Sequence, residues 1–82
     1  MTKTFIHIGN GHRIVRERLR SISPIGSEPI RREIQNLRKN NRLIDATKGR
    51  KARTLVTTIC GYAYLSMLTV ETIENRANND IK

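Results

Sequence analysis

The chain has very few aromatic residues: one phenylalanine, two tyrosines and no tryptophan among 82 residues. Large aromatic side chains bury the most area, so a chain this short and this poor in them forms only a marginal core by itself. Small domains without disulfides or metals commonly gain the missing stability by association with identical copies. We therefore expect a single domain over residues 1–82 that forms a homo-oligomer.

Cysteine is also scarce, because Cys60 is the only one. An intramolecular disulfide is therefore impossible, and an oxidising compartment is not indicated. No apolar run approaches the ~20 residues that a membrane-spanning helix requires. The first residues lack the apolar segment and the cleavage pattern of a secretory signal. We expect a cytoplasmic protein without a membrane partner.

Groups that carry catalysis or bind metals are few. A metal site needs several ligands, and His7 and His12 are the only histidines. Cys60 lies in a predicted turn without a basic neighbour that would activate it as a nucleophile. The pair Gly9-x-Gly11 lacks the third glycine and the following helix of a dinucleotide site. We expect no enzyme, cofactor, metal or small-molecule substrate; the one enzymatic alternative that the composition permits is a ribonuclease using His7 and His12.

Acidic residues are rare in the first two thirds of the chain. Residues 1–53 hold fourteen Lys and Arg against four Asp and Glu, a balance of +10, whereas residues 54–82 hold two against three, a balance of −1. The positive field therefore belongs to one part of the sequence and should form a face. Ten of the fourteen cations are arginines, which suit bidentate contacts with phosphate or guanine. Nucleic acid is the leading partner class, ahead of an anionic membrane surface.

The densest cationic segment lies between two short β-type runs. Four cations fall within six residues around Gly49, namely Lys48, Arg50, Lys51 and Arg53. The pattern predicts a hairpin with its turn at Lys48-Gly49. We expect Asp45 to shape this hairpin, either by accepting an Asx-type hydrogen bond or through an ion pair, with the help of Thr47.

The number of cations decides between two interpretations of this hairpin. A solvated hairpin that protects an edge strand needs only one or two lysines, so four cations favour contact with phosphate. The shortage of aromatics argues against base stacking. Duplex DNA is therefore a better candidate than single-stranded RNA.

The remaining pattern predicts an α+β domain with a mostly antiparallel sheet and two helices, in the order β-β-α-β-β-β-α. Ser27 and Pro29 are suited to the start of the first helix, and Thr69 to the cap of the second. Residues 13–22 are ambiguous, because their apolar side chains could lie on a helix face or on a strand face. We favour a loop followed by a strand, since Gly9 and Gly11 precede the run and Pro24 closes it. The predicted strands are 4–8, the end of 13–22, 43–46, 52–59 and 63–68, and the predicted helices are 27–40 and a short one after Thr69.

Four blocks of the sequence form a pattern that spans nearly the whole chain: Phe5-Ile-x-Ile-Gly9-x-Gly11, Ser27-x-Pro29-Ile30-x-Arg32, Leu43-Ile-Asp-Ala-Thr-x-Gly49-Arg50-basic-x-Arg53, and Val70-Glu71-Thr72. In these blocks the chain resembles the family of the extracellular-matrix regulatory protein RemA, a bacterial biofilm transcription regulator. The central block is specific and the others are weak alone. Lys48 departs from the family pattern, since an aromatic is usual there, and residues 12–20 are richer in arginine.

The resemblance implies a fold related to the LytTR DNA-binding domain and a ring-like homo-oligomer that binds or wraps double-stranded DNA at the nucleoid. It implies an activator of matrix genes that uses Arg18, Arg50 and Lys51 on DNA, with Pro29 as a structurally sensitive position. An RNA-binding protein and a small ribonuclease remain the alternatives. The predicted DNA-binding residues are Arg16, Arg18, Lys48, Arg50, Lys51 and Arg53, and the predicted structural residues are Asp45, Gly49 and Pro29.

Overall fold

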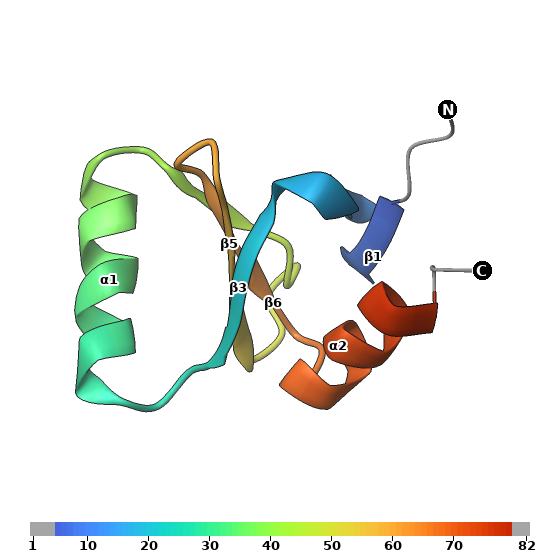
Figure 1. Ribbon diagram of the computed structural model, residues 1–82. Helices are drawn as coiled ribbons and strands as arrows, with labels where there is room; N and C mark the ends of the chain where they lie inside the picture. The colour runs from blue at the N-terminus through green and yellow to red at the C-terminus, as the bar shows by residue number, and fades with distance from the viewer. Residues whose placement is uncertain (1–4, 80–82) are drawn as a thin grey trace.

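The computed structural model describes residues 5–79, which form two helices, six strands and one 3-10 turn (Figure 1). The strands form two sheets, one of two strands and one of four. The elements are β1 (Phe5–Gly9), β2 (His12–Val15), η1 (Arg16–Arg18), β3 (Leu19–Pro24), α1 (Glu28–Lys39), β4 (Leu43–Asp45), β5 (Thr54–Thr58), β6 (Ala63–Ser66) and α2 (Val70–Asn79). The α+β class is confirmed.

The predicted order of elements was wrong in the region before α1, where the structure has one more strand than expected. The expected strand at the end of residues 13–22 is confirmed, because β3 begins there, but the expected loop before it is wrong. Residues 13–22 contain most of β2, the whole of η1 and the start of β3. Strand β2 forms because it closes an antiparallel hairpin with β1, in which Ile6 lies opposite Ile14 and both side chains are buried. The pairing with β1 decides what the local pattern left ambiguous.

The predicted hairpin between the runs 43–46 and 52–59 was also wrong. The four-stranded sheet has the order β3-β5-β6-β4, so β6 lies between β4 and β5. Strand β4 pairs with β6 in parallel, whereas β5 pairs with both β3 and β6 in antiparallel fashion. The second predicted turn, at Cys60-Gly61, does join a hairpin, and Gly61 has the positive φ of 91° that the turn requires.

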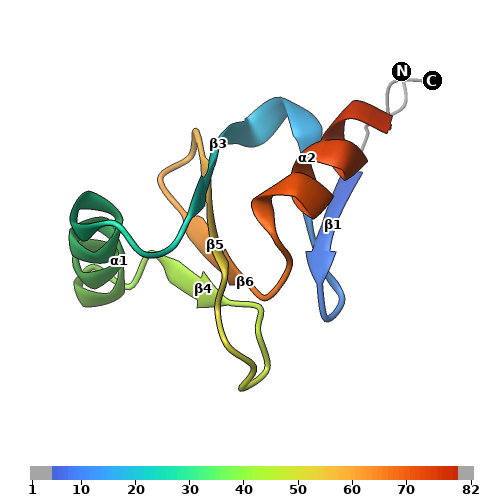
Figure 2. The same ribbon diagram turned by 90° about the horizontal axis from the view of Figure 1, so that it is seen from below.

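The two faces of the four-stranded sheet are covered by different elements. Helix α1 covers one face, where Leu55, Ala63 and Leu65 form a small cluster. The β1–β2 hairpin and α2 cover the other face, on the opposite side of the sheet from α1 (Figure 2). Ile6, Ile8, Ile14, Ala46, Val56, Ile73 and Ala77 form the larger cluster on this second face.

Strand β5 is buried along its whole length although three of its five residues are threonines. Burial of a hydroxyl is costly unless it forms a hydrogen bond, and each of these hydroxyls does so. Thr54 Oγ1 donates to Leu68 O at 2.6 Å, Thr58 Oγ1 donates to Tyr62 O at 2.7 Å, and Thr57 Oγ1 lies 2.5 Å from Ser21 Oγ. These bonds fix the ends of β5 to its neighbours.

The helix boundaries agree with the predicted ones to within a residue for α1. Ser27 occupies the N-cap position without a side-chain hydrogen bond, and Pro29 lies in the first turn. Asn41, with φ of 58°, ends the helix, and Arg42 N donates to Leu37 O at 2.7 Å.

The predicted cap of α2 is confirmed, because Thr72 N donates to Thr69 Oγ1 at 3.2 Å. Neither helix, within residues 5–79, has the length and apolar composition for crossing a bilayer.

Helix α2 depends on Ile73, which is fully buried in the larger cluster. Replacing Ile73→Ala should lower the free energy of unfolding by about 2–5 kcal/mol, because the substitution loses burial and leaves a cavity. Urea titration followed by circular dichroism, at one fixed protein concentration, measures the loss. The exposed Asn75→Ala on the same helix is the matched control and should change stability by less than about 0.5 kcal/mol. Equal effects of the two changes would contradict the assigned packing of α2.

Candidate nucleic-acid interface

The cationic segment lies on the connection from β4 to β5, residues 46–53, which projects from the body of the protein (Figure 2). The base of this connection is fixed by Asp45. Its Oδ1 accepts hydrogen bonds from Thr47 N at 2.8 Å and from Thr47 Oγ1 at 2.5 Å. The predicted Asx-type bond and the predicted help from Thr47 are both confirmed. Thr47 is buried, so the connection starts from a rigid position.

The turn at Lys48-Gly49 is present although it does not join a hairpin. Lys48 has φ of 52° and Gly49 has φ of 84°, both in the left-handed region, and Arg50 N donates to Thr47 O at 3.1 Å. Left-handed backbone strains a residue with a side chain, so Gly49 is the residue that the second position needs. The tight turn leaves Lys48, Arg50 and Lys51 exposed.

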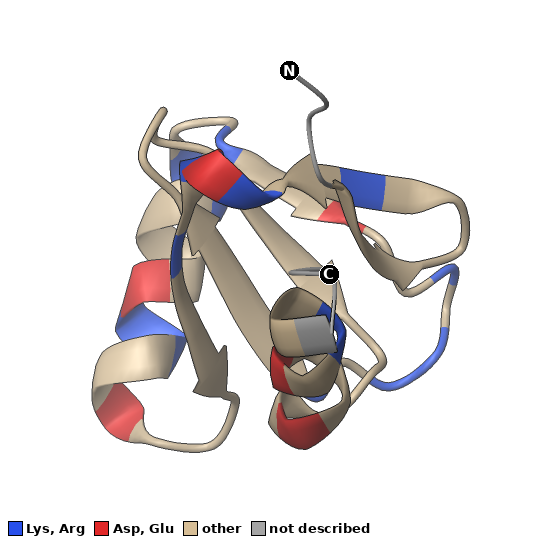
Figure 3. Cartoon of the chain, turned by 45° about the vertical axis from the view of Figure 1, so that its right-hand side comes forward, with Lys and Arg blue, Asp and Glu red and all other residues tan. Residues whose placement is uncertain are grey.

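The far end of the connection is held by the sheet backbone. Arg53 N donates to Ser66 O at 2.9 Å, and Arg53 O accepts from Ile25 N at 3.1 Å. A hollow of about 470 Å³ lies beside this end, lined by Met67 and Leu68 together with Arg50, Lys51 and Arg53. Figure 3 shows the blue stretches of this connection away from the acidic segments of α2. The four cations are therefore displayed on a backbone that is fixed at both ends.

The other predicted DNA-binding residues lie elsewhere in the protein. Arg16 and Arg18 are on η1, and Arg18 O accepts a hydrogen bond from Ile59 N at 2.9 Å, just past the end of β5. Arg53 immediately precedes the start of β5. Six steps of about 3.3 Å along a strand separate Arg53 from Ile59 by roughly 20 Å. One protomer therefore presents two cationic sites at opposite ends of β5.

A third set of cations lies on the solvent side of α1. The opposite side of α1 carries an apolar stripe that packs on the small cluster and is only half-buried. This stripe consists of Ile30, Ile34 and Leu37. Pro29 is exposed at the start of this helix. The exposed cations of α1 are Arg31, Arg32, Arg38 and Lys39.

The histidines do not form a common site. His7 is exposed on β1, and its carbonyl oxygen accepts a hydrogen bond from Arg76 Nη1 at 3.0 Å. His12 is half-buried, with its ring edge against Tyr64 at 6.2 Å between centroids. Alternation along β2 directs His12 towards the sheet and Arg13, the partner of His7, away from it. Nothing in this arrangement favours the two-histidine ribonuclease.

Cys60 is exposed, and the hydroxyl of Thr58, 3.1 Å from its Sγ, lowers the pKa of the thiol. Among residues 5–79, no group of three or more His, Cys, Asp and Glu side chains is placed to hold a metal ion.

Three contacts near these sites could not be predicted from sequence. Asn10, at the tip of the β1–β2 hairpin, donates from Nδ2 to Ala46 O at 2.7 Å and so braces the base of the cationic connection. The guanidinium of Arg13 lies 4.7 Å from the ring centroid of Phe5, and that of Arg42 lies 5.0 Å from that of Tyr62. Each contact joins residues from different segments of the chain, and no local pattern signals it.

Fold and site together define a small α+β protein that displays a rigid cationic connection at one end of its main sheet. The family model described as RemA-like, extracellular matrix regulatory protein A-like, matches residues 5–77. The chain is 39% identical over 79 residues to proteins of Bacillus cytotoxicus, Bacillus mycoides and Bacillus cereus, each named "Putative regulatory protein"; the matches cover 96% of this chain and 91% of each relative. The chain belongs to the RemA-like family, as its sequence motifs indicated.

The hydrogen bonds of Asp45 predict a pH dependence. The Thr47 hydroxyl, and then the Thr47 amide, lower the pKa of Asp45 below its ordinary value of 3.8. The contribution of the carboxylate to stability is therefore complete above about pH 4 and is lost as the pH falls through the lowered pKa. Asp45→Ala should cost about 1 kcal/mol at neutral pH, a modest value because the residue is exposed. Urea titrations at neutral and acidic pH measure this cost.

The matched control for Asp45 is Asp45→Asn, which keeps an acceptor oxygen but has no charge to titrate. It should retain most of the stability and lose the dependence on pH. A cost of Asp45→Ala that stays constant into acid would contradict the role of the charged carboxylate.

Proposed function

We propose that this protein is a DNA-binding transcriptional regulator that works as a ring-like homo-oligomer. The observation that carries the proposal is the fixed cationic connection, on which Lys48, Arg50, Lys51 and Arg53 are all exposed. A rigid backbone reduces the entropy that is lost when these side chains contact phosphate. Two of the four are arginines, which bind phosphate oxygens in bidentate fashion.

Duplex DNA is the polyanion that we favour. Tyr62 and Phe5, the aromatic rings that are most exposed, already carry arginine side chains and lie away from the cationic connection. Bases of a single strand would therefore find no stacking platform beside the four cations. Phosphates of a duplex lie close together, so several neighbouring cations can contact its backbone at once.

Assembly gives such a small site sufficient affinity. About four phosphate contacts bind weakly at physiological salt. Identical subunits in a ring present the same contacts repeatedly, so the second and later contacts form at high effective concentration. Arg16 and Arg18, at the other end of β5, give each subunit a second place to touch a bent duplex. Sequence preference then comes mainly from DNA shape and bending.

The proposed biological role rests on membership of the family. A protein of the RemA-like family that binds DNA in this way acts without catalysis at the bacterial nucleoid, as an activator of genes for biofilm matrix. The relation of its fold to the LytTR DNA-binding domain belongs to the same proposal.

DNA binding should depend on the cations at the turn. The double substitution Arg50→Ala and Lys51→Ala should abolish binding to a long duplex in a gel-shift assay and leave the oligomer intact, because it removes two phosphate contacts per subunit without changing the backbone. The matched control is Arg31→Ala with Arg32→Ala, which removes the same charge from α1. It should weaken binding far less.

Two outcomes would contradict this assignment. Equal losses from the two double variants would mean that net charge alone governs binding. A turn variant that no longer assembles would place the turn in a subunit interface. Duplex RNA of the same sequence, run in parallel, tests the alternative of an RNA-binding protein.

The affinity for DNA should also fall steeply as the salt concentration rises. If four cations per protomer contact phosphate, raising the salt from about 50 to about 200 mM should weaken the binding of one protomer roughly a hundredfold, and of an assembly much more. In the single variant Lys51→Ala, which keeps three of the four contacts, the slope of log affinity against log salt should fall by about 1 per protomer. Fluorescence anisotropy with a labelled duplex measures both slopes. A salt-independent affinity would contradict contact with phosphate.

A further inference from the structure

An apolar surface borders the cationic connection at its far end. The hollow of about 470 Å³ at this end is lined by three cations and two apolar side chains, namely Arg50, Lys51, Arg53, Met67 and Leu68. Met67 and Leu68 belong to the short link between β6 and α2, and both are half-buried. We call these two side chains the apolar wall. A group that is attached to a phosphate bound by the cations therefore lies within reach of this wall.

Hydrogen bonds hold the apolar wall in a fixed place. Leu68 N donates to Ser66 Oγ at 3.1 Å, and Thr54 Oγ1 donates to Leu68 O at 2.6 Å. Asn10 Nδ2, at the tip of the β1–β2 hairpin, donates to Met67 Sδ at 3.8 Å. The same amide donates to a carbonyl oxygen at the base of the cationic connection at 2.7 Å. The wall and the cations therefore keep a constant position relative to each other.

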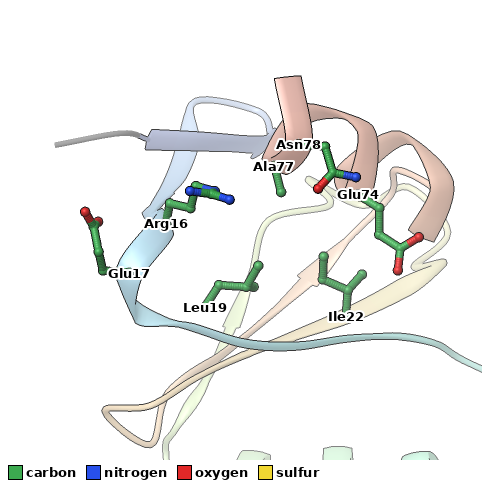
Figure 4. A pocket seen from close by; sticks show the side chains of 7 residues that line it. All are labelled: Arg16, Glu17, Leu19, Ile22, Glu74, Ala77 and Asn78. Atoms are coloured by element: carbon green, nitrogen blue, oxygen red, sulfur yellow. The ribbon is translucent and has the colours of Figure 1, made fainter. Parts of the chain in front are cut away.

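The charge around this hollow suits a polyanion. None of the five side chains that line it is acidic. A hollow of about 500 Å³ between β3 and α2 differs in this respect, because Glu17 and Glu74 line it together with Arg16, as Figure 4 shows. Carboxylates repel phosphates at short range. Of these two hollows, only the one at the apolar wall therefore suits the backbone of a nucleic acid.

The group next to each phosphate of a nucleic acid is a sugar. Deoxyribose carries only hydrogen at its 2′ position, whereas ribose carries a hydroxyl that both donates and accepts hydrogen bonds. The side chains of Met67 and Leu68 contain no donor, and their one acceptor is a weak thioether sulfur. A hydroxyl buried against them without a partner is disfavoured by a factor of roughly ten in affinity. An apolar wall beside bound phosphates therefore favours deoxyribose.

We propose that the apolar wall receives the deoxyribose next to the phosphates that Arg50, Lys51 and Arg53 bind, and that it thereby selects DNA over RNA. The inference rests on the proposed function, in which the cationic connection binds the backbone of a duplex, and it adds the sugar that this site accepts. Every nucleotide carries a sugar, so selection of this kind requires no particular base sequence.

The test compares two labelled duplexes of one sequence by fluorescence anisotropy with the full chain. One duplex is entirely DNA, and the other is the same DNA with scattered ribonucleotides in both strands. The wild type should bind the DNA duplex roughly tenfold more tightly. Met67→Gln should remove most of this preference, because glutamine has a similar length and its amide forms hydrogen bonds with a hydroxyl. Met67→Leu, which stays apolar, is the matched control and should keep the preference.

The salt dependence separates a contact with sugar from damage to the cationic connection. Met67→Gln removes no charge, so the slope of log affinity against log salt for the DNA duplex should equal that of the wild type. A lower slope in this variant would mean that phosphate contacts are lost, and Met67 would then support the connection instead of contacting the sugar. Circular dichroism checks that both Met67 variants are folded.

The outcomes distinguish this inference from the proposed function. If the wild type and Met67→Gln prefer the DNA duplex equally, the sugar is recognised elsewhere and the inference is wrong, whereas DNA binding stands. If the wild type binds both duplexes equally and the Arg50 and Lys51 double variant binds neither, the phosphate contacts stand and the apolar wall selects nothing. A wild type that binds neither duplex overturns the proposed function, and this inference with it.

Discussion

The burial of β5 is the constraint on which the rest of the protein depends. This strand lies between β3 and β6, and each of its faces supports a separate hydrophobic cluster. A chain with only three aromatic rings has little apolar surface to distribute, so one strand must serve both clusters. The threonines of β5 are tolerated in this position only because neighbouring carbonyls and a serine satisfy their hydroxyls.

The same strand separates the cationic groups into two sites. Arg53 precedes β5 and Arg18 contacts the residue that follows it, so the cations of the loop and those of η1 lie at opposite ends. In the proposed assembly, the two sites of successive subunits would form a repeated surface along a curved path. This is why DNA binding and self-association are parts of one proposal.

Sequence reasoning succeeded where the signal is local. The bounds of α1, the cap of α2 by Thr69 and the Asx bond of Asp45 all depend on residues within a few positions of one another. It failed for strand pairing. Runs 43–46 and 52–59 look like the arms of a hairpin, and only the insertion of β6 between them reveals otherwise. Strand β2 was missed for the same reason, since its partner β1 decides its conformation.

The sequence by itself determined the composition of the candidate site: four cations in six residues, a glycine that permits the turn, and an acid that shapes its base. It also determined the family, whose model matches residues 5–77. Only the tertiary structure decided where these groups lie relative to Arg16, Arg18 and the exposed ring of Tyr62. The physical reason is that strand order and the packing of the two sheet faces depend on contacts between residues far apart in the chain. No local sequence pattern predicts such contacts.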